Sequence, residues 1–225
     1  IPASSKAAVR GVLLRIQLLA EAGRDAEALD AVRKATSANP DSSELVEVEV
    51  RLLARQKQMK QALDVAQNAI KRWPNNAEMF FLLGSLQDET GDKKAAFKTM
   101  EKLLALHPDN YQALNYVGYT LAEEDRDLDR ALTLLVRAND LAPNQSYIID
   151  SLAWAYFKAG KLDDALKEIR RAVTLDEHTD ASIWEHYGDI AARAGLKDEA
   201  RTAYQKAMEL KPDNAEALRQ RLSHL

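Results

Sequence analysis

The stretch DSLAWAYFKAG at residues 150–160 decides the fold, because it carries two different faces of one helix. At helical spacing, Leu152 and Tyr156 lie on one apolar face, and Trp154 and Phe157 lie on a second. A helix that is apolar on two sides needs two neighbouring elements, or one neighbour and a bound ligand.

A second amphipathic run follows this helix after a tight turn. Gly160 ends the first run, and Ala165, Ile169 and Ala172 recur at helical spacing beyond it. The local unit is therefore a helix, a turn and a second helix.

The same unit recurs along the chain, and the prolines mark its period. Five of the six prolines are Pro40, Pro74, Pro108, Pro143 and Pro212. Their spacings are 34, 34, 35 and 69 residues, so one proline is missing from the series near Glu177. Because proline cannot continue a helix, each one marks the boundary between two units.

Small residues follow the same period. Seven of the eight glycines occupy two positions of the repeat: Gly84, Gly118 and Gly188 at one, and Gly23, Gly91, Gly160 and Gly195 at the other. A third position holds Ala28, Ala62, Ala96, Ala131, Ala165 and Ala200. We expect the first glycine set and the alanines where the two helices cross, and the second glycine set in the turn.

This pattern resembles the tetratricopeptide repeat, a unit of 34 residues with a large residue, Leu-Gly, Tyr, Ala, an aromatic, Ala and Pro. The clearest match is Trp184/Tyr187/Gly188/Ala200/Tyr204/Ala207/Pro212. The resemblance implies an all-α superhelix, or solenoid, of about six helix-turn-helix repeats plus a partial or capping helix at the C-terminal end.

The register predicts a single solenoid over residues 1–225. The predicted repeats are residues 9–42, 43–76, 77–110, 111–145, 146–180 and 181–214, followed by a capping helix at 215–225. One repeat cannot bury its apolar face alone, so stacking of neighbours is expected to stabilise the array.

Composition excludes several classes of function. The chain has 225 residues, of which 46% are hydrophobic and 29% charged, as in a folded protein. A net charge of −4 argues against a nucleic-acid partner, and the absence of cysteine excludes disulfides and thiolate sites. No run is long and apolar enough to insert into a membrane. The chain begins at Ile1, which suggests an excised or processed fragment.

The resemblance also implies where a partner binds. In tetratricopeptide arrays the first helix of each repeat lines the concave groove, through repeat positions 2, 5, 9 and 12. On this sequence the candidate partner-binding residues in the third to fifth repeats are Phe81, Asn115, Tyr119, Tyr147, Asp150, Trp154 and Phe157. Aromatic rings offer large contact area, and an asparagine amide can hold a peptide backbone. The alternative is that some of these rings only pack between adjacent repeats.

Charged residues dominate the first helix of the second repeat. Glu44, Glu47, Arg51 and Arg55 lie three or four residues apart on its groove face. This spacing predicts ion pairs along the helix.

Acidic residues at the turns are expected to cap helices. Asp41, Asp109 and Asp213 follow prolines and are predicted to cap the next helix. The acidic run at residues 125–129 resembles a calcium loop but lacks its glycine and its final glutamate, so it is interpreted as helix-capping acids in a longer turn.

No catalytic, cofactor-binding or metal-binding site is predicted. None of the four histidines has the spacing of a zinc site, and phosphate loops and nucleophile elbows are missing. We therefore expect a non-catalytic scaffold that binds a peptide or protein partner in the groove. The alternatives are a self-associating structural module, with the chain as a homo-oligomer, and the substrate-recruiting or regulatory arm of a larger enzyme.

The repeats LNYVGYTLAEE and IIDSLAWAYFKAG resemble those of bacterial tetratricopeptide proteins, many of them envelope lipoproteins or assembly factors. This resemblance implies a bacterial scaffold in the periplasm or at the outer membrane. A receptor for chaperone tails is not expected, because Leu13 and Gln17 stand where such a clamp has Lys and Asn.

Overall fold

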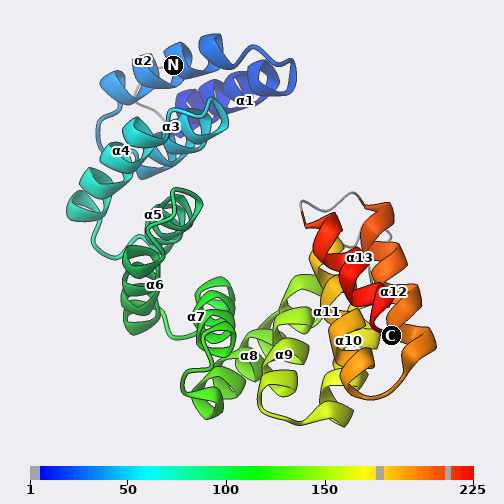
Figure 1. The fold of residues 1–225 in the computed structure, drawn as a ribbon. Helices are drawn as coiled ribbons and strands as arrows, with labels where there is room; N and C mark the ends of the chain where they lie inside the picture. Colours follow the sequence, from blue (N-terminus) through cyan, green and yellow to red (C-terminus); the bar gives the residue numbers. More distant parts are fainter. Residues whose placement is uncertain (1–5, 176–179, 211–213) are drawn as a thin grey trace. The chain divides into compact units, whose positions relative to one another are not determined.

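The computed structural model describes residues 6–175, 180–210 and 214–225, with side chains described from residue 9 onward. Within these ranges the chain forms thirteen α-helices and no strand (Figure 1). Consecutive helices pack in pairs, and each pair also contacts the next pair within a unit. The predicted all-α helical repeat is confirmed.

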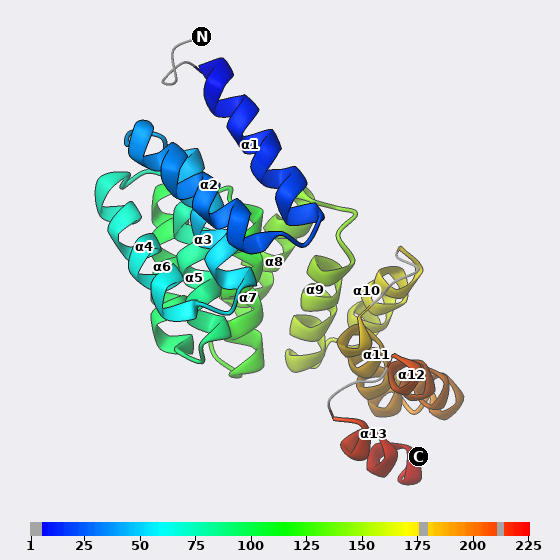
Figure 2. The same cartoon turned by 90° about the horizontal axis from the view of Figure 1, so that it is seen from above.

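The chain divides into two compact units, residues 1–107 and residues 108–225. The helices of unit 1 are α1 (Lys6–Glu21), α2 (Asp25–Ala38), α3 (Ser43–Arg55), α4 (Met59–Arg72), α5 (Ala77–Glu89) and α6 (Lys93–Leu106). Figure 2 shows α1 at the edge of this unit. The core between its helices is mostly aliphatic and includes Ile16, Val50 and Leu53.

Unit 2 contains the remaining helices. They are α7 (Tyr111–Glu123), α8 (Leu128–Leu141), α9 (Ser146–Lys158), α10 (Leu162–Thr174), α11 (Ala181–Arg193), α12 (Lys197–Glu209) and α13 (Ala215–Ser223). The helices α3, α5, α7, α9 and α11 begin at residues 43, 77, 111, 146 and 181, which open the second to sixth predicted repeats. That all repeats form one solenoid over residues 1–225 stays a prediction.

In three pairs, a glycine lies where the two helices approach closely. A Cβ atom added to Gly84 would lie 2.6 Å from the terminal methyl of Met100, and one added to Gly118 would lie 2.7 Å from Leu135 Cγ. A Cβ atom at Gly188 would overlap the ring of Tyr204. The predicted steric role of these glycines is confirmed.

The turn inside each pair needs a left-handed residue. Gly160 has a φ of +74°, as predicted, and Lys57 and Asp125 adopt positive φ at the same repeat position without being glycine. In the longer turn at 125–129, the Asp127 carboxylate accepts a hydrogen bond from the Arg130 amide at 3.3 Å and caps α8. The interpretation of this acidic run as helix caps is confirmed.

The predicted caps after the prolines are wrong by one residue. Ser42 caps α3, and the Asn110 side chain caps α7 by accepting a hydrogen bond from the Ala113 amide at 2.9 Å. These residues have the extended backbone that a cap needs, while the preceding aspartate belongs to the turn. Asp109 instead pairs with Arg137 at 2.9 Å. The third predicted cap, Asp213, lies outside the described residues.

Candidate functional site

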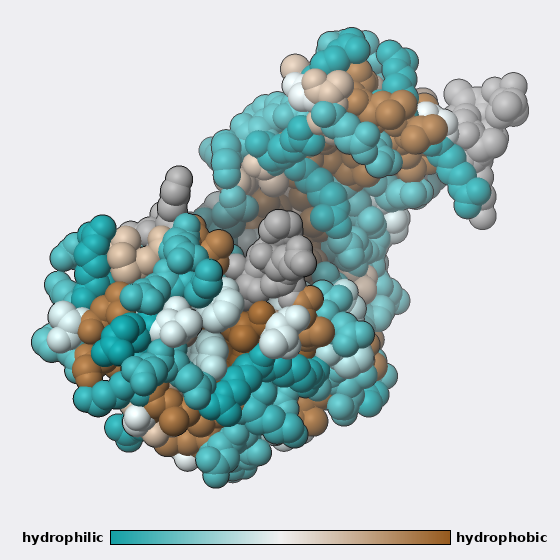
Figure 3. Space-filling view, turned by 90° about the vertical axis from the view of Figure 1, so that its right-hand side faces the viewer, coloured by the Kyte–Doolittle hydropathy of each residue, from teal (hydrophilic) through white to brown (hydrophobic). Residues whose placement is uncertain are grey.

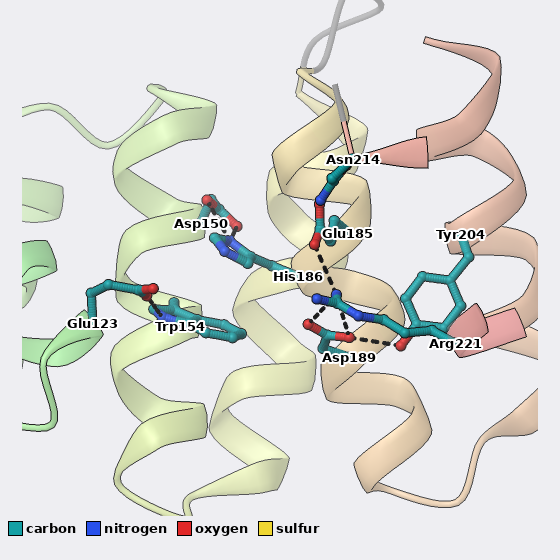
Figure 4. A network of polar contacts seen from close by, with 9 residues as sticks. All are labelled: Glu123, Asp150, Trp154, Glu185, His186, Asp189, Tyr204, Asn214 and Arg221. Atoms are coloured by element: carbon teal, nitrogen blue, oxygen red, sulfur yellow. Dashed lines mark hydrogen bonds and ion pairs between the residues drawn. The ribbon is translucent and has the colours of Figure 1, made fainter. Parts of the chain in front are cut away.

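The first helices of three successive pairs lie side by side in unit 2, because α9 packs against both α7 and α11. Their facing side chains form a surface that we call the unit 2 wall. It comprises Asn115, Tyr119 and Glu123 on α7, Asp150, Trp154 and Phe157 on α9, and Glu185, His186 and Asp189 on α11. Part of this wall is drawn in Figure 4.

A buried polar pair joins α9 to α11. His186 Nδ1 lies 2.9 Å from Asp150 Oδ1 and 3.0 Å from Oδ2 (Figure 4). Asp150 is only 6% exposed. The side chain that the sequence analysis assigned to a partner is therefore buried between two helices, where it binds a histidine of the same chain.

The electrostatics of this pair favour a bound proton. Burial disfavours the imidazolium, but the Asp150 carboxylate and its hydrogen bond outweigh that cost and raise the pKa of His186. For the Asp150 carboxyl, burial acts in the opposite direction and raises the pKa, and His186 only partly offsets this increase. The pair thus keeps a proton to a higher pH than a free histidine would.

Trp154 is fixed on the wall by contacts at both ends of its indole. Its Nε1–H donates a hydrogen bond to Glu123 Oε2 at 2.7 Å, and its ring stacks on His186 with centroids 4.2 Å apart. The ammonium of Lys158 lies 5.7 Å from the ring centroid. The ring is half-buried, so part of its surface faces solvent.

Two further rings lie next to the Trp154–His186 stack. Phe157 lies 5.0 Å from Trp154 between centroids, and Tyr119 on α7 lies 6.4 Å from His186 on α11. Burial, together with nearby carboxylates that include Glu123, raises the pKa of the Tyr119 hydroxyl, which therefore stays protonated at neutral pH. Both rings are half-buried.

Asn115 carries an unsatisfied acceptor. Its Oδ1 is buried and has no hydrogen-bond partner among the described residues. A buried amide oxygen without a partner costs free energy. The residue itself is half-buried and lies one turn before Tyr119 on α7.

The structure brings together only part of the predicted site. Three of its residues contact His186, namely Tyr119, Asp150 and Trp154, and Phe157 contacts Trp154. Asn115 lies on α7 with Tyr119. Tyr147 lies in the first turn of α9 and is 43% exposed. Phe81 is half-buried on α5 and belongs to unit 1.

Sequence reasoning missed His186 and Glu123. His186 has no metal-binding spacing to another histidine, and it lies one residue after Glu185, the fifth residue of the sixth predicted repeat and therefore a groove position. A buried carboxylate such as Asp150 needs a hydrogen-bond donor, and the histidine one repeat later could have been identified as that donor.

A second polar network joins α11 to the last two helices. Arg221 Nη1 on α13 donates to Glu185 Oε1 at 2.8 Å and to Asp189 Oδ2 at 2.9 Å, and the Tyr204 hydroxyl donates to Asp189 Oδ1 at 2.7 Å (Figure 4). Burial raises the pKa of Asp189 against the opposing effects of Tyr204 and Arg221. The carboxylates at this end of the wall are therefore largely neutralised by side chains of the same chain.

The first helices of unit 1 carry charges with different partners from those predicted. Arg51 pairs with Glu78 on α5, and Arg55 lies 3.1 Å from Asp25 on α2. Glu47 accepts a hydrogen bond from the Asn76 side chain at 2.7 Å. The prediction of ion pairs along α3 is wrong, because side chains from adjacent repeats lie within reach of the same charges.

The described residues contain no group of three or more His, Cys, Asp or Glu side chains arranged to hold a metal ion. Among the described helices, none has both the length and the apolar composition of a membrane-spanning segment.

Family models match both halves of the sequence. The model described as tetratricopeptide repeat matches residues 151–215, and the model described as ChAPs (Chs5p-Arf1p-binding proteins) matches residues 3–103. The first match covers the last helix of the unit 2 wall and most of α9.

Two curated relatives share part of the sequence. A TPR repeat-containing protein of Pseudomonas aeruginosa is 29% identical over 178 residues, or 79% of this chain. The peroxisomal targeting signal receptor of Candida albicans is 26% identical over 58% of the chain. The chain spans 30% and 29% of the lengths of these two relatives.

Solved structures share the fold. Pseudomonas aeruginosa pilF matches with a TM-score of 0.76 at 14% identity, covering 96% of this chain and 95% of that one. YrrB, described as a TPR protein with an unusual peptide-binding site, matches with a TM-score of 0.65 at 22% identity, covering 88% of this chain and 100% of that one. The tetratricopeptide repeat model thus matches residues 151–215, and the chain shares its fold with solved tetratricopeptide repeat structures.

Proposed function

We propose that this chain is a non-catalytic scaffold that binds an extended segment of a protein partner along the unit 2 wall. The observation that carries the proposal is the half-buried ring of Trp154, which Glu123 and the stack on His186 hold in place on the wall. This ring and its aromatic neighbours would cover the side chains of a bound peptide, whose backbone can hydrogen-bond to polar side chains of the groove.

The wall is organised to bind at low entropic cost. Trp154 is already held by Glu123 and by the stack on His186, so little side-chain freedom remains to be lost on binding. Tyr119 and Phe157 add ring surface on either side of the stack, and Tyr147 adds an exposed ring at the start of α9. Rings of this kind are typical of binding hot spots.

The carboxylates of the wall are paired within the chain, and this restricts the class of partner that can bind there. Asp150, Glu185 and Asp189 already have cationic or hydrogen-bonding partners within the chain. Recognition would therefore rest on aromatic contact and backbone hydrogen bonds, and a neutral, partly apolar segment fits this wall better than a strongly basic one. YrrB, which shares this fold, is described as having a peptide-binding site, and this supports a peptide segment as the partner.

The test is a comparative capture experiment with purified protein. Wild-type chain and the Tyr119→Ala/Trp154→Ala variant are immobilised, and retained proteins are identified by mass spectrometry. Arg51→Ala is the matched control, since Arg51 occupies in unit 1 the repeat position that Tyr119 and Trp154 occupy in unit 2.

We expect the double variant to weaken binding of the retained partner by about 2 to 4 kcal/mol, while the control leaves it unchanged. Equal retention by a double variant that keeps its helix content would contradict the assignment of the wall.

We also propose a location in the bacterial periplasm or at the outer membrane, as part of an envelope assembly. The support is the resemblance of residues 114–124 and 148–160 to bacterial repeats and the identity shared with the Pseudomonas aeruginosa relative. Fractionation of cells that produce the complete protein tests this location, and recovery only with cytoplasmic markers would contradict it.

A further inference from the structure

Rings of the unit 2 wall form one connected group. Trp154 contacts both Phe157 and His186, and His186 lies 6.4 Å from Tyr119 between centroids. Figure 3 shows the side of unit 2 that carries its last helices, where hydrophobic residues are interspersed among hydrophilic ones. Within the ring group, His186 is the member whose charge changes near neutral pH.

His186 binds two side chains of α9 at once. Its imidazole stacks on the Trp154 indole with 4.2 Å between centroids and 19° between planes, and its Nδ1 lies 2.9 Å from Asp150 Oδ1 (Figure 4). Asp150 and Trp154 are four residues apart and therefore lie on the same face of α9. The position of Trp154 thus depends on a histidine of the next repeat.

The hydrogen bond to Asp150 decides which nitrogen of His186 titrates. A carboxylate only accepts hydrogen bonds, so Nδ1 carries a hydrogen whether the ring is neutral or charged. Uptake and loss of a proton therefore occur at Nε2. The His186 side chain is 13% exposed, so water reaches the ring without unfolding of unit 2.

The two charge states of His186 hold the indole with different strength. An imidazolium over an indole face gains a cation–π attraction that a neutral imidazole lacks. The imidazolium also neutralises Asp150, which is only 6% exposed. Loss of the Nε2 proton leaves this carboxylate as a buried charge without a counter-ion, which favours entry of water between α9 and α11. The contact that such water would open is the one that stacks Trp154 on His186.

Carboxylates face His186 from three helices, namely Asp150 on α9, Asp189 on α11 and Glu123 on α7. Burial disfavours the imidazolium, but these carboxylates, Asp150 foremost, outweigh burial and raise the pKa of His186. The charged form of the ring therefore persists to a higher pH than in a free histidine.

Other charged or titratable groups on the helices around His186 leave it as the histidine of the wall. The Tyr119 hydroxyl on α7 stays neutral, because burial raises its pKa. The remaining groups have partners within the chain: Asp189 with Tyr204 on α12, Asp189 and Glu185 with Arg221 on α13, Arg170 on α10 with Glu199 on α12, and Lys158 on α9 with Asp125.

We propose that His186 is a positioning residue that makes the unit 2 wall sensitive to pH. With hydrogens on both ring nitrogens it holds the Trp154 indole in its stacked position, and loss of the Nε2 proton releases the indole and weakens partner binding. The hydrogen bond from Trp154 to Glu123 does not involve this proton and would then hold the indole alone. The inference rests on the proposed function, since it concerns the wall as the binding surface.

The first test follows Trp154 alone and needs no partner. The chain has three tryptophans, so the Trp73→Phe/Trp184→Phe protein reports on Trp154. An imidazolium stacked on an indole quenches its fluorescence more strongly than a neutral imidazole does. Between about pH 6 and about pH 9 we expect the fluorescence to rise with a single midpoint above about 6.5. Quenching by acrylamide should increase with the same midpoint, because the released ring is open to solvent.

Two variants in this single-tryptophan protein assign the transition. His186→Gln should abolish it, and Asp150→Asn should move its midpoint to lower pH, because the carboxylate that favours the imidazolium is gone. The matched control is Trp154→Phe/Trp184→Phe, which keeps Trp73. Arg72 lies 4.9 Å from that ring centroid and stays charged, so no transition is expected. Circular dichroism checks that each protein keeps its helix content.

The second test measures binding of the protein that the wild-type chain retains in the capture experiment. Its dissociation constant should be about fivefold larger at about pH 9 than at about pH 6, because the stack that holds Trp154 is lost. The His186→Gln variant has the other groups of the wall and should lose this difference between the two pH values.

A Trp154 fluorescence that does not change with pH would overturn the proposal, as would a transition that persists in His186→Gln. Equal pH dependence of binding in wild-type chain and His186→Gln would overturn the link between this proton and the partner. Failure to retain any partner at either pH would instead contradict the proposed function, and the fluorescence titration would still decide whether His186 positions Trp154.

Discussion

The two units apply one repeat pattern to different surface chemistry. In unit 1, Arg51 on α3 pairs with Glu78 on α5, and both side chains remain well exposed. In unit 2, Trp154 occupies the repeat position of Arg51, and the neighbouring Asp150 is buried against His186. The difference shows that the repeat decides how helices stack, while the groove positions remain free to carry specific chemistry.

The comparison also distinguishes exposed from buried ion pairs by their contribution to stability. Exposed ion pairs such as Arg51–Glu78 are screened by water and contribute little to stability. A buried pair such as Asp150–His186 is costly to break, because its remaining partner stays desolvated. Unit 2 should therefore respond more strongly to changes at its groove positions than unit 1.

The largest effect is expected at the buried pair. Asp150→Ala leaves His186 without its carboxylate in a site that excludes water, so the free energy of unfolding should fall by about 2 to 3 kcal/mol. Urea denaturation followed by circular dichroism measures this change. A loss of less than about 1 kcal/mol would mean that the Asp150–His186 pair contributes no more than an exposed ion pair of unit 1.

The glycines at the helix crossings should differ between the units. Gly188→Ala forces a methyl group into the ring of Tyr204, whose hydroxyl is tied to Asp189, so we expect destabilisation of about 1 to 2 kcal/mol. Gly84→Ala meets only the flexible end of Met100, and the better helix propensity of alanine offsets that contact to within about 0.5 kcal/mol. Equal losses in the two variants, measured by urea denaturation, would remove this distinction.

Stability should depend on pH through the pair in unit 2. The pKa of His186 is raised in the folded state by Asp150 on α9, with Asp189 and Glu123 also facing it. A raised pKa stabilises the fold fully below the unfolded value of about 6.5, and that contribution is lost as pH rises through the folded value.

Urea denaturation between about pH 6 and about pH 9 should therefore show decreasing stability in the wild-type chain, by about 1.4 kcal/mol for each unit by which the pKa is raised. The Asp150→Asn/His186→Gln variant lacks the titrating pair and should show a flatter profile. Parallel profiles for both proteins would contradict the assigned protonation of the pair.

The smallest effect is expected at the exposed ion pair of unit 1. Arg51→Ala should lower the free energy of unfolding by no more than about 0.5 kcal/mol at low salt, and by less when salt screens the charges. A loss comparable to that of Asp150→Ala would mean that the two units do not differ in the way described.

Helix starts and crossings were predictable from the sequence, because proline, glycine and alanine act through the local backbone. Gly118 and Gly160 act within a single helix pair, so their positions in the repeat sufficed. The caps were displaced by one residue, from Asp109 to Asn110, since either residue type can cap and only the backbone angles decide.

The partners of the groove side chains were not predictable in the same way. Repeat positions assign Asp150 to a face of α9, but they do not say how closely α11 approaches that face. The same limit explains why Arg51 pairs with the next repeat and why Arg221 reaches Glu185 across 36 residues of sequence. These contacts depend on the packing of neighbouring repeats, and the pattern within one repeat does not describe that packing.

Site-specific photo-crosslinking tests the central claim most directly. A benzophenone amino acid replaces Tyr119 in one protein and Arg51 in another, at the same repeat position in units 2 and 1. The protein is irradiated in the cells that produce it. We predict that a partner protein is crosslinked at position 119 and not at position 51, and that Trp154→Ala reduces its yield. Crosslinking of the same protein at position 51 alone would contradict the account, since the partner would then bind unit 1 and not the unit 2 wall.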